Sequence, residues 1–176
     1  IDTVLLDMDG TLLDKHFDDY FWEQYLPEHY CLKHDISLEQ ARHELLSRYR
    51  KVESTLCWTD LDYWSEELGL DIAELKTGLN HLIAVHPYVT EFLYFCRNTG
   101  KRVFLVTNAH PKTLSIKLEK TAIGHLFHRI ICAEEIGLAK EEGAFWQRLE
   151  QLLKFDRART MLADDTEKVL RSAEQY

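Results

Sequence analysis

Two aspartates stand two residues apart, directly after a short apolar segment near the start of the chain. Residues 4–6 are typical of a buried parallel strand, and Asp7, Asp9 and Gly10 follow them closely. Two carboxylates at the end of a buried strand are costly unless a positive charge balances them, and a bound cation is the usual solution. An Asp-Gly pair can also make a hairpin turn, but no alternating strand returns after this one. We therefore expect the chemistry of the chain to begin at Asp7.

Polar side chains also follow three later apolar segments of the chain. Thr107 and Asn108 come at the end of the second segment, Lys140 comes after the third, and Asp164 and Asp165 end the fourth. In open α/β sheets the carboxyl ends of parallel strands meet at one edge, where ligands bind. These groups and the first two aspartates are therefore expected to share one pocket.

This set of groups favours phosphate chemistry with Mg²⁺. Hard cations take oxygen ligands, and Mg²⁺ commonly binds through one or two carboxylates together with waters and a substrate phosphate. Lys140 would offset the remaining negative charge and hold a phosphate oxygen, and Thr107 and Asn108 would donate further hydrogen bonds. One carboxylate could attack phosphorus, and a second could protonate the leaving group and then activate water.

The elements that must position these groups alternate between strands and helices, which predicts an α/β fold with a parallel sheet and helices on both faces. Residues 15–86 show no strand pattern, and they are expected to form an all-helical insertion after the first strand. We accordingly divide the chain into a discontinuous core, residues 1–14 and 87–176, and a smaller helical domain, residues 15–86. The predicted strands are Thr3–Asp7, Arg102–Thr107, Arg129–Cys132 and Thr160–Ala163.

Local signals mark the helices of the insertion. Ser37 and Gln40 have the spacing of a capping box, and Asp60 and Asp71 are expected to cap two further helices. In the core, a helix is predicted over 88–97.

Composition narrows the possible partners. The chain has 176 residues, of which 45% are hydrophobic, and a net charge of −9, which argues against binding to nucleic acid. Four cysteines without Cys-x-x-Cys spacing indicate reduced thiols, and no apolar run has the length of a membrane span, so a cytoplasmic protein is expected. The chain starts without methionine and stops inside a helical pattern, so we expect further sequence at both ends.

The four groups of polar residues, taken in order, resemble the four motifs of the haloacid dehalogenase superfamily. The resemblance covers nearly the whole chain and implies a Rossmann-like three-layer fold with a small helical cap that shields the site. It implies that Asp7 is the nucleophile and Asp9 the general acid and base. It further implies that Mg²⁺ is held by Asp7, the Asp9 carbonyl and Asp165, with Asp164 beside it, and that the phosphoryl group is held by Thr107, Asn108 and Lys140.

The resemblance also narrows the reaction. A dehalogenase needs the nucleophile but has no alcohol leaving group to protonate, so it needs no general acid. A carboxylate at Asp9 can serve as that acid and therefore fits phosphoryl transfer. The stretches 2–14, 61–66, 107–111 and 140–141 are similar to those of purine 5′-nucleotidases in the superfamily, which implies GMP and IMP as substrates. The usual prolines around the motif lysine are absent, so we expect that loop to differ in shape.

Several alternatives remain open at this point. A phosphatase of the same fold could act on another small ester such as a sugar phosphate, and a catalytically inactive, binding-only relative would keep the fold without the reaction. A phospho-accepting signalling domain also combines acidic residues, Thr and Lys on a parallel sheet, but it lacks a helical insertion of this size. Most aromatic side chains of the insertion are expected in its core, and one or two are expected to face a purine base; the candidates are Tyr20, Phe21, Trp22, Trp58, Tyr63 and Trp64. His110, beside the second motif, could contact substrate or be structural.

Overall fold

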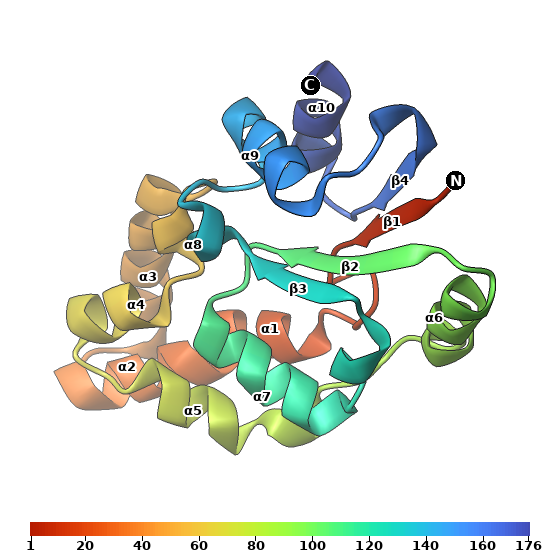
Figure 1. The fold of residues 1–176 in the computed structure, drawn as a ribbon. Helices are drawn as coiled ribbons and strands as arrows, with labels where there is room; N and C mark the ends of the chain where they lie inside the picture. Colours follow the sequence, from red (N-terminus) through yellow and green to blue (C-terminus); the bar gives the residue numbers. More distant parts are fainter.

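A four-stranded parallel sheet forms the centre of the computed structural model, which describes all residues, 1–176 (Figure 1). The strands lie in the order β3-β2-β1-β4, so the first strand is central. Thr3 pairs with Arg102 on one side and with Thr160 on the other, and Phe104 pairs with Arg129. The bounds are β1 Thr3–Leu6, β2 Arg102–Thr107, β3 Arg129–Cys132 and β4 Thr160–Ala163.

Helices cover both faces of this sheet. One face packs against a cluster of buried residues that includes Phe145, Trp146 and Leu149, and the other against a second cluster that includes Phe17, Leu93 and Leu114. Figure 1 shows the two layers, with α9 and α10 on one side of the strands and α6, α7 and α1 (His16–Tyr20) on the other. The helices of the core are α6 Val89–Asn98, α7 Pro111–Thr121, α8 Ala133–Ile136, α9 Gly143–Leu153 and α10 Glu167–Gln175.

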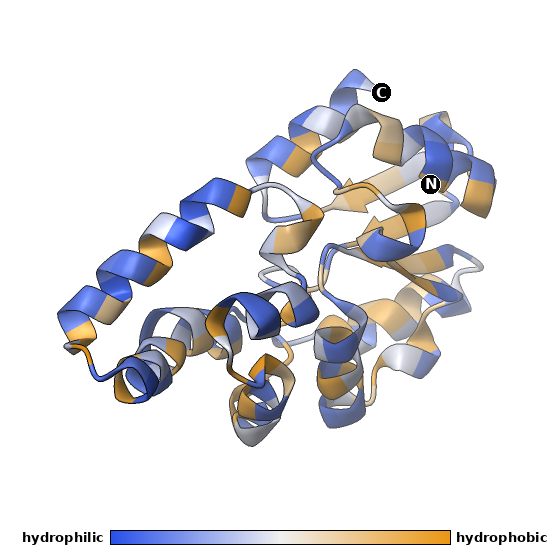
Figure 2. Ribbon diagram, turned by 90° about the vertical axis from the view of Figure 1, so that its left-hand side faces the viewer, coloured by the Kyte–Doolittle hydropathy of each residue, from blue (hydrophilic) through white to orange (hydrophobic).

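Residues 15–86 are helical and contain no strand. Their helices are α1 His16–Tyr20, α2 Leu26–His34, α3 Leu38–Val52, α4 Leu61–Leu68 and α5 Ile72–Gly78. A π-helical segment, Phe21–Tyr25, joins α1 to α2, and a short 3₁₀ helix, Leu56–Trp58, precedes α4. Figure 2 shows orange segments alternating with blue ones along the helices of the molecule, and buried apolar residues of these helices, such as Leu26, Leu45 and Trp64, belong to one cluster.

The two connections between these helices and the rest of the chain lie side by side. The backbone N–H of Asp14 donates to the carbonyl of Ala84, and that of His86 donates to Leu12. A single cluster of buried apolar side chains runs from the sheet into the helical segment. The helical segment therefore shares one apolar cluster with the core and is not packed as a separate unit.

The predicted elements are confirmed closely where the local signal was strong. Three strands match their predicted bounds, and the first ends at Leu6, although Asp7 N–H still donates to Ala163. Ser37 makes the full capping box with Gln40, and Asp60 and Asp71 cap α4 and α5. None of the helices combines the length and the hydrophobicity of a membrane-spanning helix.

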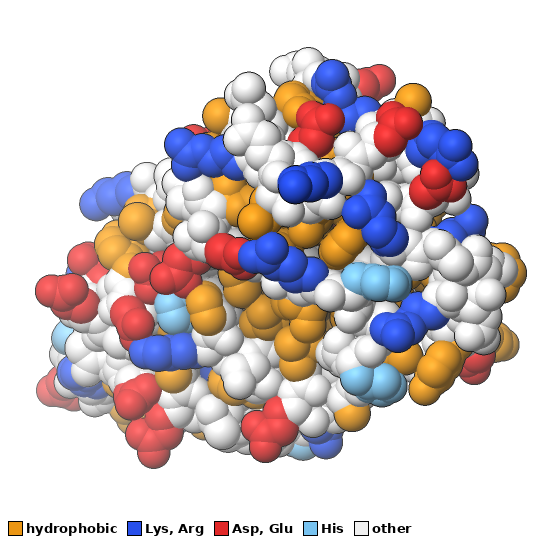
Figure 3. Space-filling model, in the orientation of Figure 1, with side chains coloured by type: hydrophobic (Ala, Val, Ile, Leu, Met, Phe, Trp, Pro, Cys, Tyr) orange, Lys and Arg blue, Asp and Glu red, His pale blue; other side chains and the backbone are white.

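The surface shows charges of both signs. In Figure 3, Lys and Arg side chains are scattered among acidic ones across the face seen in Figure 1, so this face carries no continuous basic area.

Candidate active site

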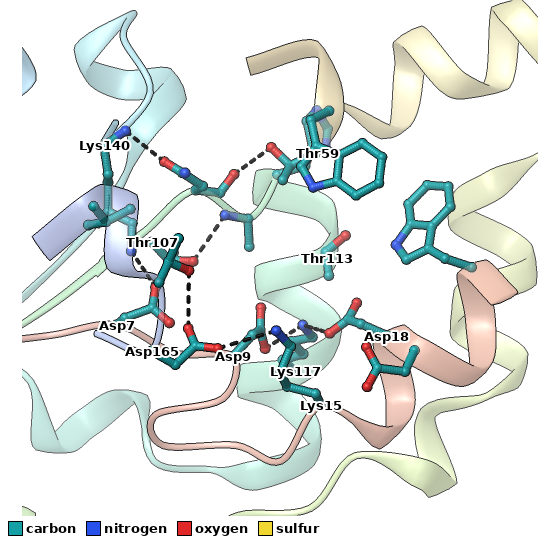
Figure 4. A pocket seen from close by; sticks show the side chains of 18 of the residues that line it. Asp7, Asp9, Lys15, Asp18, Thr59, Thr107, Thr113, Lys117, Lys140 and Asp165 are labelled. Carbon is teal, nitrogen blue, oxygen red and sulfur yellow. Dashed lines mark hydrogen bonds and ion pairs between the residues drawn. The ribbon is translucent and has the colours of Figure 1, made fainter. Parts of the chain in front are cut away.

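A pocket of about 270 Å³ opens at the carboxyl ends of the strands. It brings together Asp7, Asp9, Thr107, Asn108, Lys140 and Asp165, all six from the core of the chain. Asp18, Trp22, Trp58, Thr59 and Lys76 of the helical segment line the same pocket. Figure 4 shows Asp7 and Lys140 on one side of it and Asp18 on the other. The strand ends therefore meet as the sequence predicts, and the helical segment completes the wall.

Lys140 joins two of the aspartates. Its Nζ lies 2.5 Å from Asp7 Oδ1 and 2.6 Å from Asp164 Oδ2, and it also donates to the carbonyl of Val106. The side chains of Lys140 and Asp164 are nearly fully buried, at 3% and 1% exposed. The other oxygen of Asp164 accepts from the backbone N–H of Thr166, so both of its oxygens are occupied.

Asp165 lies against the loop that follows β1. Lys15 Nζ is 3.2 Å from its Oδ2, and the carboxylate packs so closely on Gly10 that a Cβ there would overlap it. Gly10 has φ +85°, in the left-handed region that favours glycine. The position after Asp9 therefore requires glycine, both because of its positive φ and because there is no room for a Cβ beside Asp165. One carboxylate oxygen each of Asp7, Asp164 and Asp165 lie within 4.8 Å of one another.

Asp9 points into a second set of charges. Lys117 Nζ is 2.6 Å from Asp9 Oδ1 and 2.5 Å from Asp18 Oδ2, and Lys76 Nζ is 2.6 Å from Asp18 Oδ1. The side chains of both lysines are only 2% exposed. These four residues, which we call the buried charge chain, connect the β1 loop to α7, α1 and α5.

Burial sets the direction of the pKa shifts of Asp7 and Asp9. It raises the pKa of Asp7 from 3.8 to about 6, with Lys140 opposing and Asp164 adding to the rise. Burial also raises the pKa of Asp9, against the opposing charge of Lys117. Burial acts in the same direction on Asp18, but the two ammonium groups beside it outweigh burial and lower its pKa to about 2.

Thr107 and Asn108 turn the chain from β2 into α7. Thr107 Oγ1 accepts from the backbone N–H of Ala109, and its hydroxyl proton is free for another partner. The Asn108 amide donates to Glu141 and accepts from the backbone N–H of Lys140, so it ties the two loops together. Asn108 thus lines the pocket with its side chain already engaged in the protein.

The aromatic side chains of the helical segment separate into two groups. Trp22 and Trp58 line the pocket, with their rings stacked at 6.2 Å between centroids. Trp64 is fully buried, and its Nε1–H donates to the carbonyl of Trp58. The hydroxyl of Thr59 donates to the carbonyl of Asn108 at 2.6 Å, a direct contact between the helical segment and the second motif.

His110 begins α7 at the edge of the pocket. Its Nδ1 accepts from the backbone N–H of Lys112, as an N-cap, while Nε2 lies 3.6 Å from Asp60. The side chain is 9% exposed. This arrangement explains the residue as a helix cap that faces the helical segment.

Comparison with known proteins identifies the family. The family model described as haloacid dehalogenase-like hydrolase matches residues 1–175. The chain belongs to the haloacid dehalogenase-like hydrolases. It is 38% identical, over all of its length and 79% of the relative, to the GMP/IMP nucleotidase YrfG of Escherichia coli (strain K12). Family membership makes the chain a hydrolase, and this full-length similarity places it with the phosphoric monoester hydrolases.

Solved structures of this hydrolase family share the fold. A HAD phosphatase from Thermococcus onnurineus matches with a TM-score of 0.85 and 24% identity, over 99% of this chain and 82% of its own. L-2-haloacid dehalogenase from Xanthobacter autotrophicus matches with a TM-score of 0.63 and 15% identity, over 99% and 74%. The predicted Rossmann-like α/β fold is thereby confirmed. Since a phosphatase and a dehalogenase share it, the residues of the site must distinguish the reaction.

The motifs did not reveal the buried charge chain. Asp18, Lys76 and Lys117 lie outside all four motifs, yet all three line the pocket. The only signal for the two lysines in the sequence is their spacing from apolar residues of the same helix. Lys76 stands four residues after the buried Ile72, and Lys117 stands three after the buried Leu114, so each lysine takes a position on the buried side of its helix.

Proposed function

We propose that this hydrolase releases phosphate from purine nucleoside 5′-monophosphates such as GMP and IMP, through an aspartyl-phosphate on Asp7. The observation that carries the proposal is the convergence of Asp7, Asp9, Thr107 and Lys140 on one pocket at the strand ends. The full-length similarity to a GMP/IMP nucleotidase supports the choice of substrate.

In this proposal Asp7 attacks phosphorus. Its carboxylate is held at the end of the central strand by Lys140, which fixes the attacking group and offsets charge on the incoming phosphate. Thr107 donates its hydroxyl proton to a phosphate oxygen. Asn108 contributes by holding the backbone of Lys140 in place.

Asp9 acts first as a general acid and then as a general base. As a general acid it protonates the leaving oxygen when the bond from phosphorus to that oxygen breaks. It then takes a proton from the water that attacks the aspartyl-phosphate, which restores the Asp7 carboxylate. A raised pKa, caused by burial, suits a carboxyl group that must carry a proton in one half of the cycle.

The residues around Asp7 fit Mg²⁺. Three carboxylates converge there, and oxygen donors of this kind are what Mg²⁺ prefers. Asp7 and Asp165, together with the backbone carbonyl of Asp9, would hold the ion, with Asp164 beside them. A bound Mg²⁺ supplies the positive charge that allows a phosphate dianion to lie beside carboxylates. Asp164 also positions Lys140, because its two oxygens are bonded within the protein.

The helical segment acts as the cap domain over this site. Its Trp22 and Trp58 give the pocket an aromatic wall and also line an adjoining hollow of about 900 Å³, where a nucleoside could extend. We propose that they stack on the purine base, whereas Trp64 belongs to the cap core. All four cysteines are free, which suits the reducing cytoplasm.

Phosphate release tests the proposal directly. GMP, IMP, AMP, a pyrimidine nucleotide and a sugar phosphate are compared, with Mg²⁺ and with chelator. Mg²⁺-dependent release that favours GMP and IMP and is lost in Asp7→Asn supports it. Asp35→Asn is the matched control, since Asp35 is exposed and already in the left-handed conformation that asparagine accepts. A preference for the sugar phosphate would refute the nucleotide substrate and favour a sugar phosphatase. Activity retained in Asp7→Asn would refute the role of Asp7 as nucleophile.

A further inference from the structure

Asp9 has one protein partner for its side chain. Lys117 Nζ lies 2.6 Å from Oδ1, and Oδ2 accepts no hydrogen bond from the protein. The Asp9 side chain is 26% exposed and lines the pocket, while the Lys117 side chain is 2% exposed. Lys117 therefore holds one oxygen from behind, and the other remains available to substrate.

Lys117 is itself held in place. Asp18 Oδ2 lies 2.5 Å from its Nζ, and Asp18 Oδ1 takes the ammonium of Lys76. The Lys117 ammonium also lies 5.4 Å from the ring centre of Phe17. With two carboxylates and an aromatic ring around it, this ammonium has little freedom to move away from Asp9.

We propose that Lys117 is a positioning residue for general acid catalysis, which keeps the Asp9 carboxyl turned so that Oδ2 meets the leaving-group oxygen. The inference rests on the proposed role of Asp9. In the step concerned, an oxygen of Asp7 forms a bond to phosphorus, the bond from phosphorus to the leaving oxygen breaks, and the proton on Asp9 moves to that oxygen. A misplaced Asp9 slows this step in proportion to the need of the leaving group for a proton.

That dependence gives a test specific to positioning. p-Nitrophenolate is a stable anion and leaves without a proton, whereas phenoxide, and the ribose alkoxide of GMP still more, require one. A general loss of folding or of phosphate binding lowers the rate for all esters equally. Loss of the acid lowers it selectively for the esters with poor leaving groups.

The chain offers a matched control in Lys76. Lys76 and Lys117 are equally buried, and both donate to Asp18, but only Lys117 touches Asp9. Substitution of either by methionine removes one buried charge at similar volume. Both variants should lose stability, and only Lys117→Met should lose the proton transfer.

The measurement is kcat/KM of the Mg²⁺-loaded enzyme for p-nitrophenyl phosphate, phenyl phosphate and GMP. This parameter covers only the steps up to release of the leaving group, so hydrolysis of the aspartyl-phosphate does not enter. We expect Lys117→Met to lose at least about tenfold more activity on phenyl phosphate and GMP than on p-nitrophenyl phosphate. Lys76→Met should change all three alike.

Equal losses on the three esters in Lys117→Met, or the same selectivity in Lys76→Met, would overturn the inference. If Lys117→Met does not fold, Lys117→Gln replaces it, and its activity on p-nitrophenyl phosphate reports a folded site. A wild type that cleaves both aryl esters but not GMP would refute the nucleotide substrate alone, since the aryl pair still decides the role of Lys117. A wild type that cleaves none would refute both.

Discussion

Replacing Asp7 by asparagine is expected to stabilise the metal-free protein while it abolishes catalysis. The Asp7 side chain is 9% exposed and lies near Asp164 and Asp9, and Lys140 compensates this burial only in part. Asparagine resembles the protonated acid in shape, and its carbonyl oxygen can still accept from Lys140. The substitution therefore removes the cost of a buried charge without removing a contact.

The size of the gain follows from the pKa. Burial raises the pKa of Asp7 from 3.8 to about 6, and the folded state thus binds a proton more tightly than the unfolded state. The free energy of unfolding therefore falls as pH rises from 3.8 to 6, because Asp7 loses its proton there, and the loss stays constant above pH 6. Above pH 6 the loss is roughly 3 kcal/mol, and near pH 5 it is about half as large.

Urea unfolding in chelator, followed by the fluorescence of the four tryptophans, measures this difference. Asp7→Asn should exceed wild type by up to about 3 kcal/mol at pH 8 and by about half of that at pH 5. Asp35→Asn should match wild type at both. An Asp7→Asn variant less stable than wild type at pH 8, or an equal gain at the two pH values, would refute the electrostatic explanation.

Three further substitutions and the addition of Mg²⁺ have outcomes set by the same structure. Gly10→Ala places a Cβ on the Asp165 carboxylate at positive φ. Urea unfolding should show that the free energy of unfolding falls by about 1–2 kcal/mol because of backbone strain. A titration of activity with Mg²⁺ should show that the variant needs more Mg²⁺ than wild type. Trp64→Ala empties the cap core and should cost about 3–5 kcal/mol in the same unfolding assay. Mg²⁺ at about a hundred times its Kd should raise the free energy of unfolding by about 2.7 kcal/mol in thermal denaturation, and Asp165→Asn should abolish that gain.

The sequence predicted the strands closely because each is a short apolar run between helical patterns, and such runs have few alternatives in an α/β chain. Caps were equally local, as Ser37, Asp60 and Asp71 bond to backbone within three residues. The convergence of the motif residues followed from topology alone, since parallel strands end at a shared edge.

Tertiary pairing was beyond such arguments. Lys117 meets Asp9 across 108 positions of sequence, and nothing in α7 itself marks the lysine for that partner. The division of the tryptophans depends on packing too. Trp22 lies in the π-helical segment, which breaks the 3.6-residue period on which a prediction of its direction would depend. The engagement of Asn108 with Glu141 likewise depends on how two distant loops meet.

The charged residues of the pocket form two groups that differ in net charge. Around Asp9 the two carboxylates, Asp9 and Asp18, face two buried ammonium groups, so this group of residues is neutral without any ion. Around Asp7 three carboxylates face Lys140 and the half-exposed Lys15, so this group of residues keeps a net negative charge. A phosphate dianion is repelled there unless a cation joins it. The proposed Mg²⁺ would offset this excess negative charge beside Asp7, whereas the charge of the Asp9 carboxylate is already balanced by Lys117.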